Sequence, residues 1–171
     1  MMMTMKQYKK AADYQKKHGG EAEIAIVLGS GLGGYEEALI DAKYVEYGDI
    51  PGFPVSTVPG HAGRFAFGSL NGRRVMMMAG RFHSYEGYSM EEVTMAVRVM
   101  HLLGVQTLLL TNAAGGVRES FAPGTLMLIT DYLNLSGRNP LRGPNLDQFG
   151  PRFPDMSQAF DLELRNIAKA Q

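Results

Sequence analysis

Residues 23–34, EIAIVLGSGLGG, join an apolar β-branched run to a turn in which four of the six residues are glycine. The run from Glu23 to Leu28 predicts a buried strand that stops at the glycines. Such a turn brings backbone N–H groups close to an anion, and α/β proteins tend to place ligands after strands. The simpler interpretation is that the glycines only permit a tight connection.

Outward from this segment, two apolar runs at 64–70 and 73–79 flank Asn71-Gly72, the strongest short signal for a β-hairpin. Strands that alternate with helices indicate a layered α/β fold, and the hairpin requires antiparallel pairing. We therefore expect a mixed β-sheet flanked by helices. Further strands are expected over 105–111 and 126–133, and helices over 6–18, 35–40, 89–103 and 155–171.

Capping signals mark two of these helices. Ser89 and Glu92 predict a capping box, and Gly104 predicts the end of the same helix. Asp155 is the expected N-cap of the last helix, after a Pro-, Gly- and Arg-rich loop at 134–154 of a length that is usually functional. The apolar stripe expected on the first of these helices is Val93, Val97, Met100 and Leu103.

Composition excludes several classes of site. Seventeen basic and seventeen acidic residues cancel, so the overall charge gives no reason to expect nucleic acid or an anionic membrane as partner. The chain contains no cysteine, which excludes disulfides and thiolate sites and weakly favours a cytoplasmic protein. We expect no metal site, because metal-ligand spacing is absent. The N-terminus does not resemble a signal peptide, and no stretch is long enough to cross a bilayer.

The segment 80–88 concentrates side chains that suit an anion and a sugar. Arg81 offers a two-pronged donor that matches phosphate oxygens, and His83 adds a donor at each nitrogen when protonated. Glu86 follows His83 at a distance that allows it to orient the imidazole or hold its proton. Tyr85 presents a flat face with a hydroxyl. A solvated loop with a surface ion pair is the alternative for any one of these residues.

Three other turns are candidates for binding. Ser30 could supply a hydroxyl to an oxyanion, and His61 lies among small residues that allow close approach of a ligand, although it could equally be a structural histidine. The small residues of 112–116 leave room for a flat ligand or for close packing. A dinucleotide site at 29–34 is disfavoured, because the following helix is short and no suitable acid follows. A Walker A loop is excluded by the absence of Gly-Lys-Ser/Thr.

Five segments together resemble the trimeric purine nucleoside phosphorylases, in order and with matching spacing. They are 26–33 (IVLGSGLG), 57–63 (TVPGHAG), 80–87 (GRFHSYEG), 111–116 (TNAAGG) and 139–145 (NPLRGPN), and Arg152-Phe153-Pro154 continues the match. Each motif is weak alone. The resemblance implies that residues 1–171 are the N-terminal portion of a single nucleoside phosphorylase domain that assembles as a homotrimer.

The resemblance also assigns roles by position. It implies phosphate binding by Ser30, His61, Arg81, His83 and the Ala113 amide. The expected catalytic residues are His83 and Glu86, with Glu86 orienting the histidine. Tyr85 would pack on the ribose, Phe153 would reach the ribose pocket of a neighbouring subunit, and Ala114 and Gly115 would line the base. Inorganic phosphate is a co-substrate, and no cofactor is expected.

Members of this family extend well past the length of this chain, and their purine-reading residues lie in that extension. We therefore expect the 171-residue chain alone to have little phosphorolysis activity. A methylthioadenosine phosphorylase of the same family and an inactive phosphate-binding remnant are the alternatives to a purine nucleoside phosphorylase. A dehydrogenase is a distant further alternative.

Overall fold

The computed structural model describes residues 3–55 and 62–171 of the chain. The polypeptide divides into two compact units, the first ending at Ala113 and the second running from Ala114 to Gln171. The first unit contains the sheet and three helices, and the second consists mainly of irregular chain with one helix. None of the described helices is long and apolar enough to cross a membrane.

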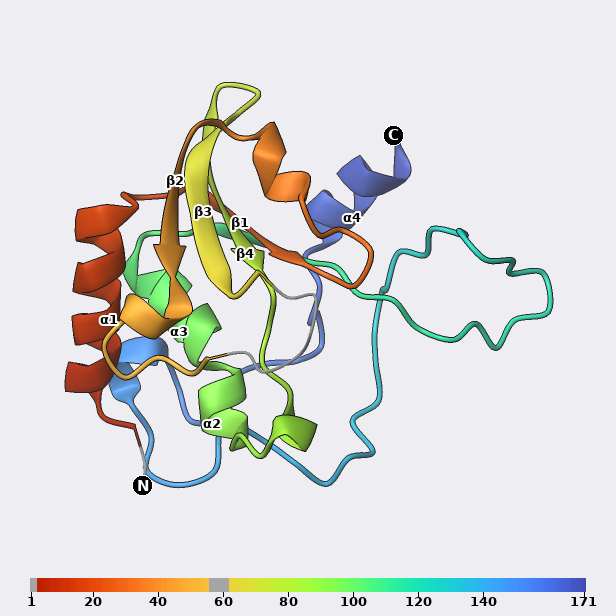
Figure 1. Cartoon of the computed structure of the whole chain (residues 1–171). Coiled ribbons are helices and arrows are strands. Elements are labelled where there is room, and N and C mark those ends of the chain that lie inside the picture. Colours follow the sequence, from red (N-terminus) through yellow and green to blue (C-terminus); the bar gives the residue numbers. More distant parts are fainter. Residues whose placement is uncertain (1–2, 56–61) are drawn as a thin grey trace. The chain divides into compact units, whose positions relative to one another are not determined.

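A five-stranded mixed sheet forms the centre of the first unit, which confirms the expected fold class (Figure 1). The strands lie in the order β2-β3-β4-β1-β5. β1 is parallel to its two neighbours β4 and β5, whereas β2, β3 and β4 pair antiparallel. The strands are β1 (Ile24–Leu28), β2 (Ile40–Glu46), β3 (Arg64–Leu70), β4 (Arg73–Ala79) and β5 (Thr107–Leu110).

The hairpin between β3 and β4 has the predicted bounds. Leu70 pairs with Arg73, and the two turn residues between them have φ values of +49° at Asn71 and +75° at Gly72. Positive φ at both positions gives a turn whose twist matches that of the flanking strands. Asparagine and glycine tolerate this conformation best, so the hairpin is determined locally.

Three helices belong to the first unit: α1 (Met5–His18), α2 (Met90–Val93) and α3 (Met95–Leu102). The capping box is confirmed, because Glu92 Oε2 accepts from the Ser89 amide at 2.8 Å and Ser89 Oγ accepts from the Glu92 amide at 3.3 Å. The chain leaves α3 at Gly104 with a φ of +87°, as expected.

The prediction of one continuous helix over 89–103 was wrong. The helix breaks at Thr94, whose backbone leaves the helical region and whose hydroxyl donates to the Met90 carbonyl at 2.9 Å. Val97, expected in the buried stripe, is 43% exposed, because the buried face of α3 is made by other positions. The buried positions are Met95, Ala96, Val99, Met100 and Leu103.

Three further predictions are corrected by the structure. Residues 126–133 are not a strand, because they pair with no other segment of the second unit that the structure describes. The last helix, α4, is shorter than expected (Leu162–Lys169), and its N-cap is Asp161, which accepts from the Leu164 amide at 2.8 Å. Asp155 instead accepts from the Ser157 amide at 2.8 Å in a local turn, and this bond lowers the pKa of Asp155. Residues 35–38 form a short 3₁₀ turn, and β2 begins at Ile40.

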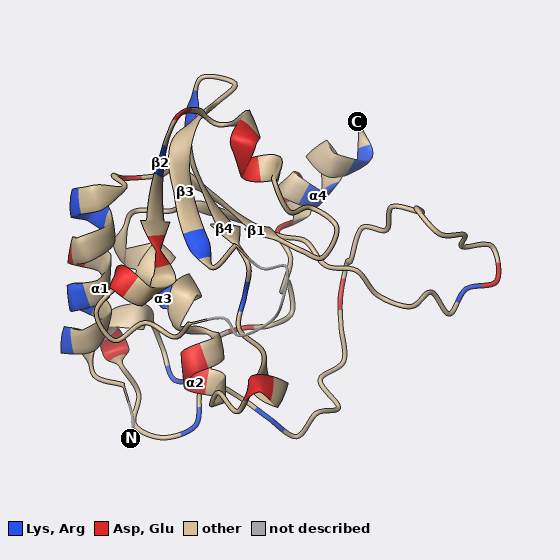
Figure 2. Ribbon diagram, viewed as in Figure 1, with Lys and Arg blue, Asp and Glu red and all other residues tan. Residues whose placement is uncertain are grey.

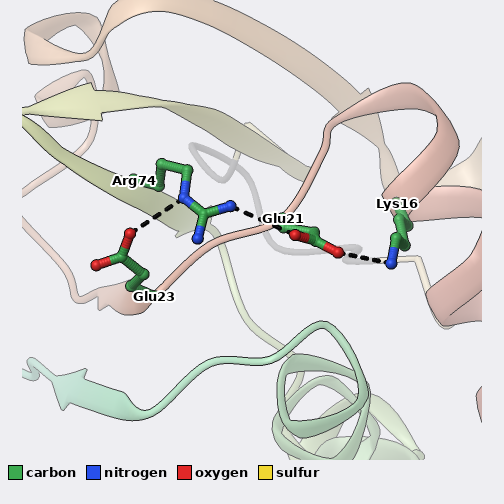
Figure 3. Close-up of polar contacts among 4 residues, drawn as sticks. All are labelled: Lys16, Glu21, Glu23 and Arg74. Carbon is green, nitrogen blue, oxygen red and sulfur yellow. Dashed lines mark hydrogen bonds and ion pairs between the residues drawn. The ribbon is translucent and has the colours of Figure 1, made fainter.

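Exposed ion pairs join the end of α1 to the amino ends of β1 and β4 (Figure 3). Glu21 pairs with Lys16 at 2.6 Å and with Arg74 at 3.4 Å, and Arg74 also binds Glu23 at 3.1 Å. The hydrogen bond from Lys16 is the main reason that the pKa of Glu21 is lowered. Because water screens such pairs, they add little stability. They lie at the opposite end of β1 from the glycine-rich turn.

An aromatic cluster supports the other end of the sheet. Tyr47 lies within 5.5 Å, centroid to centroid, of the rings of Phe53, Phe65 and Phe82, and it is fully buried. Its hydroxyl donates to the carbonyl of Gly80 at 2.6 Å. Burial raises the pKa of Tyr47 well above its ordinary value, and the negative charges of Glu36 and Glu46 add to the effect. The phenol therefore stays protonated and keeps its donor.

We expect Tyr47→Phe to lower the free energy of unfolding by about 1–2 kcal/mol, because the buried Gly80 carbonyl loses its donor. The effect should be constant below about pH 10 and should shrink at higher pH, because ionisation of this phenol in the unfolded chain then destabilises the parent. Denaturant unfolding at several pH values measures both. Tyr35→Phe is the control, since Tyr35 is half-exposed, and equal effects of the two substitutions would contradict the expectation.

Candidate functional site

The sheet brings three turns to one edge. β4, β1 and β5 are adjacent and parallel, so their carboxyl ends point the same way (Figure 1). Leu28 is in register with Ala79, and Val27 is in register with Leu110. The next residues along the three strands are therefore neighbours: Gly29 after β1, Gly80 after β4 and Thr111 after β5. Such an edge is where open α/β sheets bind ligands.

Thr111 connects the ends of β1 and β5 through its side chain. Its hydroxyl accepts from the Gly29 amide at 2.7 Å and donates to the Val27 carbonyl at 2.9 Å. Its own amide also donates to Val27 at 3.2 Å. The hydroxyl thus continues the ladder of the two strands by one further step. Thr111 belongs to the 111–116 motif, but the sequence does not indicate its role, because its partners are more than 80 residues away.

Gly29 must be glycine for a steric reason. A Cβ atom at this position would lie 2.6 Å from the Thr111 carbonyl oxygen and 2.8 Å from Asn112 Cα, and both are backbone atoms. Neither can move without disturbing β5. The approach of the two strand ends therefore requires glycine at the first position of the turn. The residues that follow it, 30–34, are exposed.

Arg81 is tied to the same point. Its Nη1 donates to the Thr111 carbonyl at 2.7 Å, and its side chain is half-buried. The Arg81 side chain thus reaches from the end of β4, past the end of β1, to the residue that follows β5. Ser30, the predicted hydroxyl donor, is exposed immediately after Gly29. The sheet therefore places Ser30 and Arg81 on neighbouring turns at one edge.

The loop after Arg81 is ordered by its own side chains. Glu86 Oε1 accepts from the backbone amide of His83 at 2.8 Å, which closes a short 3₁₀ turn over Ser84–Glu86. The ring of His83 stacks on the ring of Tyr85, with 4.7 Å between centroids and 10° between planes. Tyr85 is 75% exposed, so its outer face is open to solvent. The hydrogen bond from the His83 amide to Glu86 holds the backbone at His83 in one orientation.

The remaining predicted site residues fall into other parts of the chain. His61 lies outside the described residues. Ala113 is exposed at the end of the first unit, three residues after β5. Ala114, Gly115 and Phe153 belong to the second unit, where all three are exposed. The first unit thus contains the described members of the predicted phosphate set and Tyr85, and the second contains the predicted base-lining residues and Phe153.

The donor groups at these turns suit an oxyanion rather than a cation. Basic and acidic residues are scattered over the first unit (Figure 2). Arg81 follows β4 in the sequence. Amide donors of a glycine-rich turn, a hydroxyl and a guanidinium are the groups that bind phosphate in proteins. Within the described ranges, no three His, Asp or Glu side chains are grouped to hold a metal ion.

The fold and this edge define an α/β protein with a candidate oxyanion site at the carboxyl ends of parallel strands. Residues 23–171 match the family model described as the phosphorylase superfamily, and the chain belongs to this superfamily.

Similar proteins agree with this assignment. The chain is 52% identical over 169 residues to the purine nucleoside phosphorylase of Rattus norvegicus and 54% identical over 160 residues to purine nucleoside phosphorylase 1 of Geobacillus stearothermophilus. These matches cover 96% and 93% of the chain but 58% of each relative. Isoform 2 of the Schistosoma mansoni purine nucleoside phosphorylase, solved with cytosine and ribose-1-phosphate, superposes with a TM-score of 0.90 at 44% identity. That match covers 98% of this chain and 60% of the Schistosoma chain.

We expect Thr111→Val to lower the free energy of unfolding by about 1–3 kcal/mol, because the Gly29 amide is left without an acceptor in a partly buried position. Valine keeps the shape of threonine, so packing changes little. Thr111→Ser keeps the hydroxyl and is the matched control, for which a smaller loss is expected. Denaturant unfolding of the three proteins makes the comparison, and equal destabilisation by valine and serine would show that the hydroxyl bridge has no weight.

Proposed function

We propose that this chain is part of a purine nucleoside phosphorylase. The whole protein would cleave purine nucleosides or deoxynucleosides, such as inosine and guanosine, with inorganic phosphate. The products would be a free base and (deoxy)ribose 1-phosphate, and the reaction would serve purine salvage. The relatives that share about half of the residues are named for this activity. A Schistosoma enzyme with the same fold was solved in complex with inosine.

The anchoring of Arg81 supports this proposal most directly. A guanidinium held by a backbone carbonyl has lost much of its side-chain freedom before the ligand arrives. It stands beside a turn whose first amide is already bonded and whose later residues are exposed. A small dianion such as phosphate is the ligand that fits a preorganised donor set of this size and charge.

The mechanism follows from the charges that develop in the reaction. As the bond between the sugar and the purine breaks, the sugar becomes an oxocarbenium-like cation. A phosphate oxyanion held by Ser30, Arg81 and His83 would stabilise this cation and then attack its anomeric carbon. The protein would therefore act by positioning and electrostatics. No cofactor is required by this chemistry, because phosphate is itself the nucleophile.

Other residues would complete the site. Tyr85, whose outer face is open, would pack on the ribose, and Glu86 would keep the turn at His83 in place. His61 and the Ala113 amide would add phosphate donors. Ala114 and Gly115 would line the base, and Phe153 would act in the ribose pocket of a neighbouring subunit. A homotrimer and a cytoplasmic location belong to the same proposal and rest on the family resemblance.

Arg81→Met should weaken binding of inorganic phosphate by more than about tenfold, because a charge-assisted donor is lost. Calorimetry on the 171-residue chain measures the dissociation constant, first for phosphate and then for inosine in the presence of phosphate. Arg73→Met is the matched control, since Arg73 lies at the other end of β4 with an exposed side chain. Phosphate binding unchanged in Arg81→Met would contradict the proposed site.

The same titrations separate the proposed enzyme from a remnant. Binding of both phosphate and inosine supports a nucleoside site in this chain, whereas phosphate binding alone favours a phosphate-binding remnant. A chain that binds neither ligand would contradict the proposal.

A further inference from the structure

The glycine-rich turn has a second anchor that the proposed reaction does not use directly. Residues 30–35 are all exposed, but Glu36, the next residue, is 1% exposed. Its Oε1 accepts from Arg64 Nη2 at 3.3 Å, in an ion pair whose carboxylate side chain is 2% exposed. The turn is therefore anchored at both ends, by the hydrogen bond from the Gly29 amide to Thr111 and by the ion pair between Glu36 and Arg64.

Arg64 stands in a row of residues that leads to the candidate site. It pairs with Ala79 across β3 and β4, and Ala79 pairs with Leu28 across β4 and β1. The residues that follow Leu28 and Ala79 are Gly29 and Gly80, the first residues of the two turns. The ion pair thus holds the C-terminal end of the glycine-rich turn to the row formed by Arg64, Ala79 and Leu28. The turn itself begins at the next residue after this row, Gly29.

The pair is held in place on both sides. The Arg64 guanidinium lies 4.4 Å from the centroid of the Tyr44 ring. In the described part of the chain, Glu36 Oε2 and Arg64 Nε are buried without a hydrogen-bond partner. The buried Glu36 carboxylate therefore depends mainly on Arg64. The Glu36 side chain of this pair is 2% exposed and that of Arg64 is 32% exposed. Such a partly buried pair adds little net stability, because desolvation offsets attraction, but it specifies one arrangement of the segments that it joins.

The four glycines of the turn are the reason that its conformation must be fixed by other contacts. Glycine loses more backbone freedom on ordering than any other residue, so an unanchored turn of this composition would sample many conformations. A turn that must present amides and the Ser30 hydroxyl to an anion binds it more weakly when it must first be ordered.

We propose that Glu36 and Arg64 are positioning residues that hold the turn 29–34 in its phosphate-binding conformation. This inference deepens the proposed function and rests on it. Neither residue touches the phosphate. They act through the turn, so their loss should weaken phosphate binding and loosen the turn while the sheet stays intact.

The test compares the parent 171-residue chain with three variants. Glu36→Gln removes the charge and keeps an acceptor oxygen, and Glu37→Gln is the matched control, since Glu37 is its exposed neighbour in the same 3₁₀ turn. The double variant Glu36→Leu/Arg64→Met replaces both charges by apolar groups of similar size, which buried pairs often tolerate without loss of stability. It covers the case in which Glu36→Gln fails to fold.

Two measurements apply to each protein. Calorimetry gives the phosphate dissociation constant, which should rise about tenfold in Glu36→Gln and in the double variant and stay within about twofold in Glu37→Gln. Hydrogen exchange reports the turn directly through the amides of Leu32 and Tyr35, which bond to Gly29 and Leu32 at 3.1 and 3.2 Å. These amides should exchange about tenfold faster in the two affected variants, while those of β3 and β4 keep their parental rates.

Each outcome decides the inference. Parental phosphate affinity, or parental exchange at Leu32 and Tyr35, in a folded Glu36→Gln or double variant would overturn it. Equal acceleration of exchange in the turn and in β3 and β4 would also overturn it, because the pair would then stabilise the fold as a whole. If the parent chain binds no phosphate, the proposed function fails, and the exchange rates still decide whether the pair holds the turn.

Discussion

The approach of Gly29 to Thr111 is the constraint on which the candidate site depends. Two parallel strands end so close together that a Cβ atom at Gly29 would lie 2.6 Å from a backbone oxygen. The Thr111 hydroxyl occupies this junction and satisfies the Gly29 amide, and the Thr111 carbonyl receives Arg81. A single residue therefore joins three strand ends, and the positions of the glycine-rich turn and of the guanidinium are coupled through it.

A chain with no net charge needs local means to bind an anion. The candidate site offers directional donors held by backbone atoms rather than a broad basic surface. Arg81 is bonded to Thr111, the turn that follows it is closed by Glu86, and the residue before it, Gly80, accepts from the Tyr47 hydroxyl. Preorganised donors of this kind spend little free energy on reorganisation when the ligand binds.

Sequence patterns predicted what is determined locally. The Asn71-Gly72 hairpin and the Ser89–Glu92 capping box depend on residues a few positions apart, and the structure confirms both. The strand expected over 126–133 has the right composition, but a strand also needs a partner, and composition does not supply one. Thr111 and the Glu36–Arg64 pair were missed because their contacts join residues 28 to 84 positions apart, which no local pattern encodes.

The order of the site along the chain has a physical consequence. The proposed phosphate donors that the structure describes follow β1, β4 and β5, and their supports come from β3, β5 and the aromatic cluster, all in the first unit. The residues assigned to the base and to the neighbouring ribose come from the second unit, where exposed and irregular chain predominates. An anion that must stabilise a cation needs accurate placement, whereas a stacked base or ring tolerates more freedom. The unit that contains the sheet therefore holds the proposed groups for which geometry matters most.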